Sequence, residues 1–581
     1  MKFTARYLLG IGVMCTLIVD PYTMDPINLP KLTILGLGIF LLFLQIIRTQ
    51  STGKLFNFRQ IDKFAFGLIL LMIIWMSSSA FANSQSSAQI ILGEWARNNG
   101  ILSYFFLSIL FLLVSVFQDK KFGEKLVFAL AILGVPLAFF GVLQRFAFDP
   151  LSKLFPWYNP SSSLALTLGN SNFASVMLAV TFTATLGSIL ASRKNTFRIT
   201  YFLVSLLLHI YLITYIDTQG KIAYAVGALS IITFSVFRVR KKTLSKLKIV
   251  IIFIIASISI QGLMGLAGRG IFASMLSNNI VNLEDRYFHW LAAIRMIEKF
   301  PLFGVGIDSF GLFYRDFRYE ESIALRGSPM PGTNNAHNLF LQFGATGGIP
   351  LMILYISLVL YVTWRGVQVL KVSNYNLSVS TLISLWFTLQ VQSLVSIDNV
   401  GLSIWNWMIS GTILLAYNNL PSKSSEDELN VRYSSQWVKG LTYLLKPTLV
   451  VVLGLNTYLL THYFYEKVIF SNFKSLGDSV TLIEKEERAK TFYLNSLKSN
   501  RPGLSIKSAN YLGQAGFVDE ALELAKHTSI YSPRTIEAWD IIASIYESRD
   551  EKENAVKYRQ KTVELDPLNV VFKDLLRKDL T

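Results

Sequence analysis

Cysteine and charged side chains are scarce in this sequence. Cys15 is the one cysteine, and it stands within an apolar run, which excludes an intrachain disulfide framework and a thiolate metal cluster. Charged residues make up only 16% of the 581 residues, whereas 52% are hydrophobic, and the mean hydropathy is +0.44. A chain this apolar cannot be mainly a water-soluble globule, so we interpret it as a polytopic membrane protein.

Acidic residues are also few, at 37 against 54 basic ones, for a formal net charge of +17. In a soluble protein this excess would suggest a nucleic-acid partner. Here the basic residues cluster in short connections between apolar runs, so orientation in the membrane explains them better and no nucleic-acid partner is expected. The sequence also contains no phosphate-binding glycine loop with lysine, no nucleophile elbow and no dinucleotide fingerprint.

Long apolar runs predict about 13 helices that cross the membrane in contact with its lipids. Some of these runs are shorter than the roughly 20 residues that a span usually needs. The runs lie near 7–20, 32–47, 64–82, 101–117, 126–144, 173–191, 200–217, 222–237, 249–267, 350–364, 377–396, 402–418 and 446–464. No small-residue cleavage site follows the first run, so we interpret it as a retained span rather than a removed signal peptide.

The basic connections alternate along the chain and predict its orientation. They lie near 48–63, 118–125, 191–198, 238–248 and 364–371, and the positive-inside rule places them in the cytoplasm together with the N-terminus. The loops 83–100, 145–172 and 268–349 then lie outside, as does the C-terminus. A structureless loop of about 80 residues is unusual, so 268–349 is expected to form helices of its own and to bind or react.

The composition changes near residue 465, which divides the chain into a transmembrane unit, 1–465, and a soluble helical domain, 466–581. Within the latter, 511–533 and 545–567 match at a shift of 34 residues, with Ala521 opposite Ala555. This period is typical of tetratricopeptide repeats. The expected fold class is all-α, a transmembrane helix bundle followed by an α-solenoid that either stabilises itself or binds a protein partner.

The segment 334–354 brings a histidine and glycines to the start of an apolar run. If it is helical, Leu341, Gly344 and Gly348 share a face with His337, and the two glycines form a pair that permits close approach. One interpretation is a docking groove, headed by the imidazole, for a helix or a lipid-linked ligand. The other is ordinary helix packing, with His337 hydrogen-bonded at the membrane boundary.

The segment 283–310 precedes that run and predicts an amphipathic helix that ends before Pro301. Its apolar stripe consists of Leu283, Tyr287, Trp290, Leu291 and Ile294, and Arg286 lies off the stripe. A helix of this kind can lie on a membrane surface. Arg286 would then be available to an anion.

These features together resemble the bacterial O-antigen ligase and O-antigen polymerase superfamily, over about residues 90–420. The residues that carry the resemblance are Arg286, Trp290, Pro301, Gly304, Gly306, His337, Asn338 and Gly348. Asn170 belongs to a segment similar to the family's Gly-Asn-x-Asn-x-Ala entry to a span. Lys221 stands in a segment where relatives often carry Ser-Arg-Gly, and Arg97 opens a span from the outer side.

The resemblance implies an enzyme of the bacterial cytoplasmic membrane that transfers a glycan from undecaprenyl diphosphate to a glycolipid such as lipid A core, a glycan or a protein. Arg286, Lys221 and Arg97 would offset charge on the diphosphate, although Arg97 and Lys221 could instead snorkel at the interface. His337 would be a general base or a hydrogen-bond donor to phosphate.

The residues predicted to bind substrate also include Asn338, Gly348, Asn170 and Trp290, from the resemblance, and Gly344, from its helical spacing to His337. We expect no cofactor and no metal, because the carboxylates predicted on the outer face lack ligand-like spacing. His289 and His337 show no carboxylate partner at a recognisable offset.

Three alternatives remain at this point. A glycan polymerase would use the same chemistry and differ in its acceptor. A transporter would explain the spans, but most charges lie at span ends rather than at midpoints. A membrane-anchored scaffold would explain the repeats but not the cations of the long outer loop.

Overall fold

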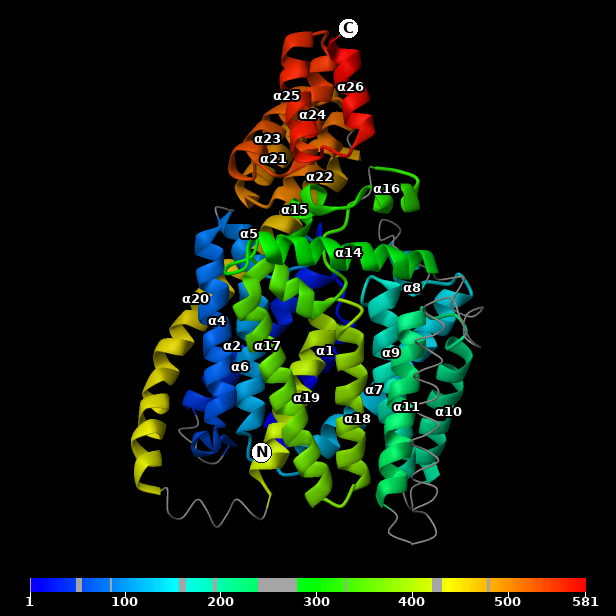
Figure 1. The fold of residues 1–581 in the computed structure, drawn as a ribbon, viewed down its shortest axis with the longest axis vertical. Helices are drawn as coiled ribbons and strands as arrows, with labels where there is room; N and C mark the ends of the chain where they lie inside the picture. The colour runs from blue at the N-terminus through cyan, green and yellow to red at the C-terminus, as the bar shows by residue number, and fades with distance from the viewer. Residues whose placement is uncertain are drawn as a thin grey trace.

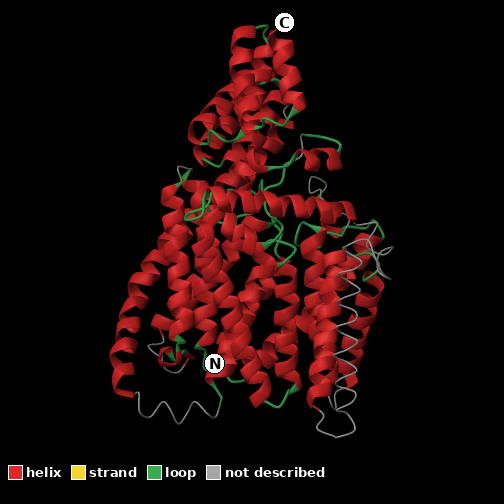
Figure 2. Ribbon diagram, in the orientation of Figure 1, coloured by secondary structure: helices red, strands yellow, loops and turns green. Residues whose placement is uncertain are grey.

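The computed structural model describes residues 2–48, 55–83, 86–155, 164–191, 196–238, 280–329, 332–420, 431–477 and 481–580. Over this part the chain is helical, and extended pairing is confined to an isolated antiparallel bridge between Phe56 and Phe117. Figure 2 shows the resulting all-helical molecule. The predicted all-α fold class is therefore confirmed.

Within the described residues twelve helices form the bundle, and successive helices run in alternating directions except α11 and α17, which run the same way (Figure 1). They are α1 (Lys2–Leu17), α2 (Asn28–Arg48), α4 (Lys63–Ala82), α6 (Ile101–Ser115), α7 (Phe122–Arg145), α9 (Ser171–Ala191), α10 (Thr196–Leu212), α11 (Thr218–Arg238), α17 (Leu339–Val372), α18 (Leu377–Ser393), α19 (Val400–Asn418) and α20 (Val431–Gly477). Each predicted apolar run coincides with one of these described helices except 249–267, which lies outside the described residues.

Eight of the described helices are long and apolar enough to cross a membrane, namely α2, α4, α7, α9, α11, α17, α19 and the part of α20 from Tyr443 to Leu476. Helices α6 and α10 are apolar but shorter. This composition makes the protein a multi-pass membrane protein.

Helix α19 lies at the centre of the bundle. The apolar stretch of this helix is 89% buried. The Trp405 indole N–H donates a hydrogen bond to Thr16 Oγ1 in α1 at 2.8 Å. Gly12 permits this approach, because a Cβ there would lie 2.8 Å from the Trp405 ring. Gln390 in α18 likewise donates to Asn406 at 2.8 Å. Such interhelical bonds satisfy polar groups that lipid cannot satisfy.

The connections gather at two ends of the bundle. The N-terminus lies at one end, and the C-terminal helices lie at the other (Figure 1). The second end also carries α5 (Ser87–Leu92), α8 (Pro150–Leu154), α14 (Ile280–Lys299), α15 (Phe310–Phe317) and α16 (Glu320–Arg326), whereas the short η1 (Phe58–Gln60) joins α2 to α4 at the first. The predicted outer loops therefore share one end of the molecule.

Helix α14 lies across the end of the bundle rather than along it (Figure 1). Its buried face consists of His289, Ala292, Ala293 and Met296. Tyr287, from the predicted apolar stripe, is 53% exposed, and Ile294 is also exposed. An exposed apolar stripe of this kind suits a helix that rests at a membrane surface.

The C-terminal part consists of α21 (Leu482–Ser499), α22 (Pro502–Gln514), α23 (Val518–Tyr531), α24 (Ile536–Ser548), α25 (Lys552–Leu565) and α26 (Val570–Leu580). A shift of 34 residues carries the bounds of α22 and α23 onto those of α24 and α25. Ala521 and Ala555 are buried at equivalent places. The internal repeat in the sequence thus corresponds to two equivalent helix pairs, and their assignment as tetratricopeptide repeats stays a prediction.

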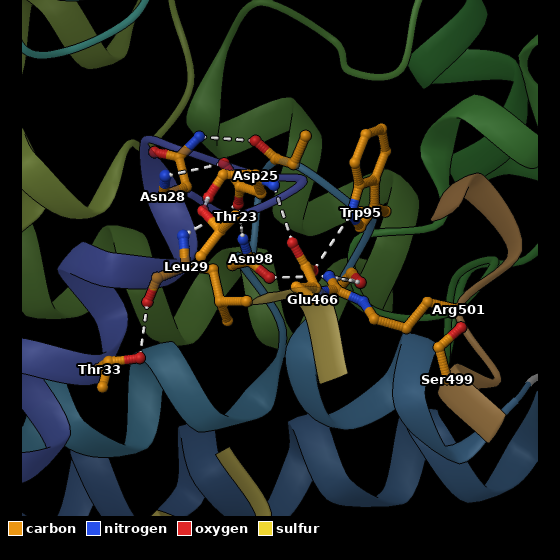
Figure 3. Close-up of polar contacts among 12 residues, drawn as sticks. Thr23, Asp25, Asn28, Leu29, Thr33, Trp95, Asn98, Glu466, Ser499 and Arg501 are labelled. Carbon is orange, nitrogen blue, oxygen red and sulfur yellow. Dashed lines mark hydrogen bonds and ion pairs between the residues drawn. The ribbon is translucent and has the colours of Figure 1, made fainter. Parts of the chain in front are cut away.

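Helix α20 runs without a break across residue 465, where the sequence predicts the domain boundary. A buried polar cluster fastens the C-terminal part to the bundle end (Figure 3). In it, Arg501 forms an ion pair with Glu466 at 3.0 Å and donates to Asn98 Oδ1 at 2.7 Å. Glu466 also accepts from the backbone N–H of Asp25 at 2.8 Å and from the indole N–H of Trp95 at 3.2 Å.

Candidate active site at the bundle end

His337 stands just before α17, and its backbone is fixed from two sides. Its φ of 48° lies in the left-handed region, which a non-glycine residue adopts at a cost. The His337 N–H donates to Asn335 Oδ1 at 2.8 Å, and the Trp290 indole N–H lies 3.5 Å from the His337 carbonyl oxygen. Trp290 of α14 therefore lies against the backbone of His337, and its role in substrate binding stays a prediction.

Asn338 begins α17 as its N-cap residue. Its Oδ1 accepts from the N–H of Leu341 at 3.0 Å, and its Nδ2 donates to the carbonyl oxygen of Leu394 at the end of α18 at 3.0 Å. A cap of this kind satisfies backbone groups that the first helical turn leaves free. The side chain of Asn338 is therefore engaged in holding the two helix ends together.

The ring of His337 stacks on the ring of His289 in α14, with centroids 5.1 Å apart and an angle of 21° between planes. Arg326 donates to His289 Nε2 at 2.9 Å and forms two hydrogen bonds with Asp285, at 2.6 and 2.7 Å. Because an arginine can only donate, the Nε2 atom of His289 accepts and its proton lies on Nδ1. Burial lowers the pKa of His289 to about 4, so the ring is neutral.

One expectation about His289 was wrong. No carboxylate partner was expected for it, yet Asp285 Oδ2 lies 3.6 Å from its Nε2 atom. Both atoms accept, so Arg326, which donates to each residue, links them. The two residues are four apart on α14, which places them on the same helix face. The offset was visible in the sequence, whereas nothing in the sequence indicated that Arg326 would join them.

The charges of three arginines act on His337. Burial, the His289 ring and the positive charges of Arg286, Arg97 and Arg326 together lower the pKa of His337 well below its ordinary value. The arginines come from α14, from the loop before α6 and from α16. The fold therefore brings Arg286, Arg97 and His337 together at one end of the bundle, around an imidazole that is neutral at neutral pH.

The guanidinium group of Arg97 is only partly paired. It donates through Nη2 to Asn334 Oδ1, and its Nε lies 3.7 Å from Glu94 Oε2. The Nε and Nη1 atoms are buried and have no hydrogen-bond partner among the described residues. Burial raises the pKa of Glu94 to about 8 and that of Asp308 to about 6. At neutral pH these acids therefore offset only part of the Arg97 charge.

Arg286 has acidic neighbours but makes no hydrogen bond to a side chain within the described residues. Burial lowers its pKa, and the charges of Asp217 and Asp285 act in the opposite direction. The Oδ2 atom of Asp217 is itself buried without a partner. A partly buried cation and a buried carboxylate oxygen without hydrogen-bond partners among the described residues are both available to a polar ligand group.

The glycines of α17 do not form an open groove. A Cβ on Gly344 would lie 2.6 Å from Ile297, and one on Gly348 would lie 1.9 Å from the carbonyl oxygen of Leu302. Gly348 has a φ of 82° and kinks the helix, so the face predicted to run from His337 to Gly348 is not continuous. The docking-groove interpretation is thus corrected to close packing of α17 against α14 and the turn at Pro301.

Two further predicted residues lie apart from this cluster. Lys221 is exposed in the first turn of α11 and is absent from the charges that act on His337. Asn170 lies at the start of α9, where its Oδ1 accepts from the N–H of Asn172 at 2.8 Å, and it lines a cavity. That cavity has a volume of about 560 Å³, and Arg97 and Asn334 form part of its wall.

Comparison with known proteins gives a family match over part of the chain. No curated protein matches the chain. Residues 204–356 match the model of a family described as O-antigen ligase, and this span contains Arg286 and His337. Within the described residues, no group of three His, Cys, Asp or Glu side chains is arranged to hold a metal ion. Over residues 204–356, the chain is therefore similar to the O-antigen ligase family.

Proposed function

We propose that this protein transfers a glycan from undecaprenyl diphosphate to an acceptor hydroxyl or amide. The observation that carries the proposal is the stacking of the His337 ring on His289, which Arg326 contacts at 2.9 Å, beside Arg286 and Arg97, whose positive charges help to lower the pKa of His337. Arg326 is neutralised by Asp285, whereas Arg97 keeps two unpaired nitrogen atoms. An anion with several acceptor oxygens, such as a diphosphate, would satisfy groups that the protein leaves unpaired.

The cations would act on the leaving group. In the reaction, the bond between the anomeric carbon and the diphosphate oxygen breaks, and the acceptor oxygen or nitrogen bonds to that carbon. Negative charge then grows on the departing lipid diphosphate. Buried guanidinium groups that are already in place stabilise this charge without reorganising, so Arg286 and Arg97 lower the barrier.

His337 would act after the donor binds. Its lowered pKa makes the ring a poor proton acceptor while the surrounding cations are uncompensated. A bound diphosphate supplies negative charge that raises the pKa again, so the ring can take the acceptor proton as the new bond forms. A neutral ring can also donate a hydrogen bond to a phosphate oxygen, and both roles require the same position.

The lipid part of the donor fits the position of α14. This helix lies across the bundle end and exposes Tyr287 and Ile294 next to the arginine cluster. A polyprenyl chain in the membrane would pass below it while the diphosphate reaches Arg286. The basic connections at the opposite end favour an arrangement in which this site faces the outside of a bacterial cytoplasmic membrane.

The test is release of undecaprenyl diphosphate by purified full-length protein in liposomes, with lipid-linked glycan extracted from membranes of the source organism as donor. We expect His337→Ala to slow release by at least about 100-fold, as loss of a general base or of a preorganised donor does. His527→Ala, which removes a histidine of α23, is the matched control and should leave the rate unchanged. Equal rates in both variants would refute the role of His337.

The product distinguishes the alternatives that share these spans. A ligase joins the glycan to a separate acceptor, whereas a polymerase lengthens the lipid-linked glycan itself. A transporter or a scaffold releases no lipid diphosphate. Wild-type protein that releases none under these conditions would contradict the proposed reaction.

A further inference from the structure

We infer that the 560 Å³ cavity beside Arg97 binds a carbohydrate chain and that the C-terminal helices supply part of its wall. The inference rests on the proposed function and extends it, because it assigns a place to the sugars rather than to the diphosphate. The volume lies within the range of about 300–1,000 Å³ that is typical of ligand pockets.

The cavity lies between the bundle end and the C-terminal part. Its wall includes the loop between α1 and α2, the loop before α6, the start of α9 and the loop between α18 and α19. Phe470 and Phe473 of α20 and Lys507 and Tyr511 of α22 complete it. A ligand there would touch both parts of the protein.

Amide side chains give the cavity its polar character. The five asparagines in its wall are Asn28, Asn99, Asn170, Asn334 and Asn399. An amide both donates and accepts hydrogen bonds, as a sugar hydroxyl does, and carries no charge. Asn28 and Asn399 are hydrogen-bonded to each other, whereas the Asn170 Nδ2 and Asn99 Oδ1 atoms have no hydrogen-bond partner among the described residues. A hydrocarbon chain would leave these two groups unpaired at a cost, so the lining favours a hydroxyl-rich ligand.

Aromatic rings give the same wall apolar surfaces. They belong to Trp95, Phe173, Phe470, Phe473 and Tyr511. The rings of Phe473 and Tyr511 lie 4.2 Å apart, and the ammonium group of Lys507 lies 4.9 Å from the Trp95 ring centroid. A sugar ring presents hydroxyls at its edge and C–H groups on its faces, so amides together with aromatic surfaces match both of its sides.

The wall contains two acidic residues, Asp25 and Asp398, and Asp25 is engaged within the protein. Asp25 accepts hydrogen bonds from the backbone N–H groups of Ile27, Asn28 and Leu29, and from Asn98 Nδ2. Its charge is therefore used within the protein. The Oδ2 atom of Asp398 has no hydrogen-bond partner among the described residues and can accept from a sugar hydroxyl. A ligand therefore meets amides, ring faces, this carboxylate and the cationic groups of Lys507 and Arg97.

The cavity and the proposed reaction centre share a residue, Arg97. Arg97 and Asn334 line the cavity, and Arg97 is also one of the cations that act on His337. A glycan bound here would reach the arginine cluster with one end. The same chemistry fits the glycan of the donor or the glycan of the acceptor, and the experiment separates the two.

The first experiment measures occupancy without turnover. Lys507→Cys places a thiol in the cavity wall, and the native Cys15 is buried, with its thiol donating to the carbonyl oxygen of Lys31 at 3.4 Å. We expect a glycan to slow labelling of Lys507→Cys by a maleimide at least about threefold, because bound ligand excludes the reagent. Lys552→Cys, exposed at the start of α25, is the matched control and should label at an unchanged rate.

Two probes identify the source of the glycan. One is the oligosaccharide that mild acid releases from the organism's lipid-linked pool, and the other is the oligosaccharide of its finished surface glycolipid. Protection by the first indicates the donor chain, and protection by the second indicates the acceptor. If neither slows labelling, the inference is refuted even when the enzyme is active, whereas an inactive enzyme refutes only the proposed function.

The second experiment separates binding from catalysis. Tyr511→Ala removes a ring face, and we expect it to raise the KM of one glycan substrate about tenfold with little change in kcat, as loss of uniform binding energy does. Tyr493→Ala in α21, outside the cavity, serves as the control. An unchanged KM for both substrates would argue against sugar binding at this wall.

Discussion

Two clusters of buried arginine lie at the same end of the bundle and differ in how they are paired. Arg501 is 1% exposed and meets Glu466, Asn98 and the Gly93 carbonyl oxygen (Figure 3). Arg97 has two buried nitrogen atoms without partners among the described residues. A buried cation is stable when its partners are in the protein, and an unsatisfied one suits a ligand that supplies them. The first cluster therefore serves the fold, and we assign the second to substrate.

The largest effect is expected from breaking the paired cluster. Arg501→Met leaves Glu466 buried without its cation, and losing one partner of a buried ion pair costs about 3–5 kcal/mol. We expect a corresponding loss in the free energy of unfolding, measured by chemical denaturation of the full-length protein in detergent.

A double variant tests whether pairing is the cause. Arg501→Met with Glu466→Leu removes both charges, so much of the lost stability should return. If the double variant is as unstable as the sum of the single ones, the ion pair is not what fastens the C-terminal helices.

The next effect is expected at the incompletely paired arginines, where activity should fall while stability is kept. Arg286→Ala removes a charge that the leaving group needs, and loss of one preorganised donor typically lowers kcat about 10²–10³-fold. The melting temperature should stay nearly unchanged, because no described side chain accepts a hydrogen bond from Arg286. Initial rates and thermal unfolding are measured on the same preparation. A large drop in Tm would show that Arg286 stabilises the fold.

A third, smaller effect is expected at the outer contact between α15 and the repeats. Asp566 is fully buried and pairs with Arg318 at 2.5 Å and with Arg315 at 2.9 Å. Asp566→Asn keeps the shape but removes the charge, which should cost about 1.5–3 kcal/mol, the value of a hydrogen bond to a charged group. Denaturation measures the loss, and Asp574→Asn on exposed α26 is the control that should have no effect.

The sequence was sufficient to predict the helices but not to predict which side chains pair with one another. Apolar runs predict spans because every backbone group in lipid must be satisfied within a helix, and the 34-residue repeat predicts α22 to α25 because equivalent residues pack equivalently. The resemblance named Arg286, Arg97 and His337, which the fold brings together.

Residues that meet only through the fold escaped prediction. Arg326 has no local pattern that points to His289, and Gly344 and Gly348 could equally border a groove or a neighbouring helix. The packing of Ile297 and Leu302 against these glycines is a tertiary fact that helical spacing does not contain. The contribution of Lys507 and Tyr511 to the cavity likewise depends on how the C-terminal helices dock.

The smallest effect is expected from pH. Raising the pH ionises Glu94, so that Arg97 gains a carboxylate partner within the protein, as Arg501 already has. The pKa of Glu94 is raised to about 8, so the folded protein holds a proton there that the unfolded chain releases near its ordinary value of 4.5. Between these values the folded state binds more protons, and the free energy of unfolding must fall as pH rises. Asp308, with a pKa of about 6, contributes in the same direction only at lower pH.

Glu94→Gln should therefore flatten the stability profile between about pH 6 and 8, measured by denaturation at several pH values, since the linkage slope depends on this proton. In the wild type, ionised Glu94 also pairs with Arg97, 3.7 Å away, and competes with the diphosphate for it. The rate of lipid diphosphate release should then decline toward pH 8 in the wild type and decline less in Glu94→Gln. If the rate depends on pH in the same way in both proteins, ionised Glu94 does not compete with the diphosphate for Arg97.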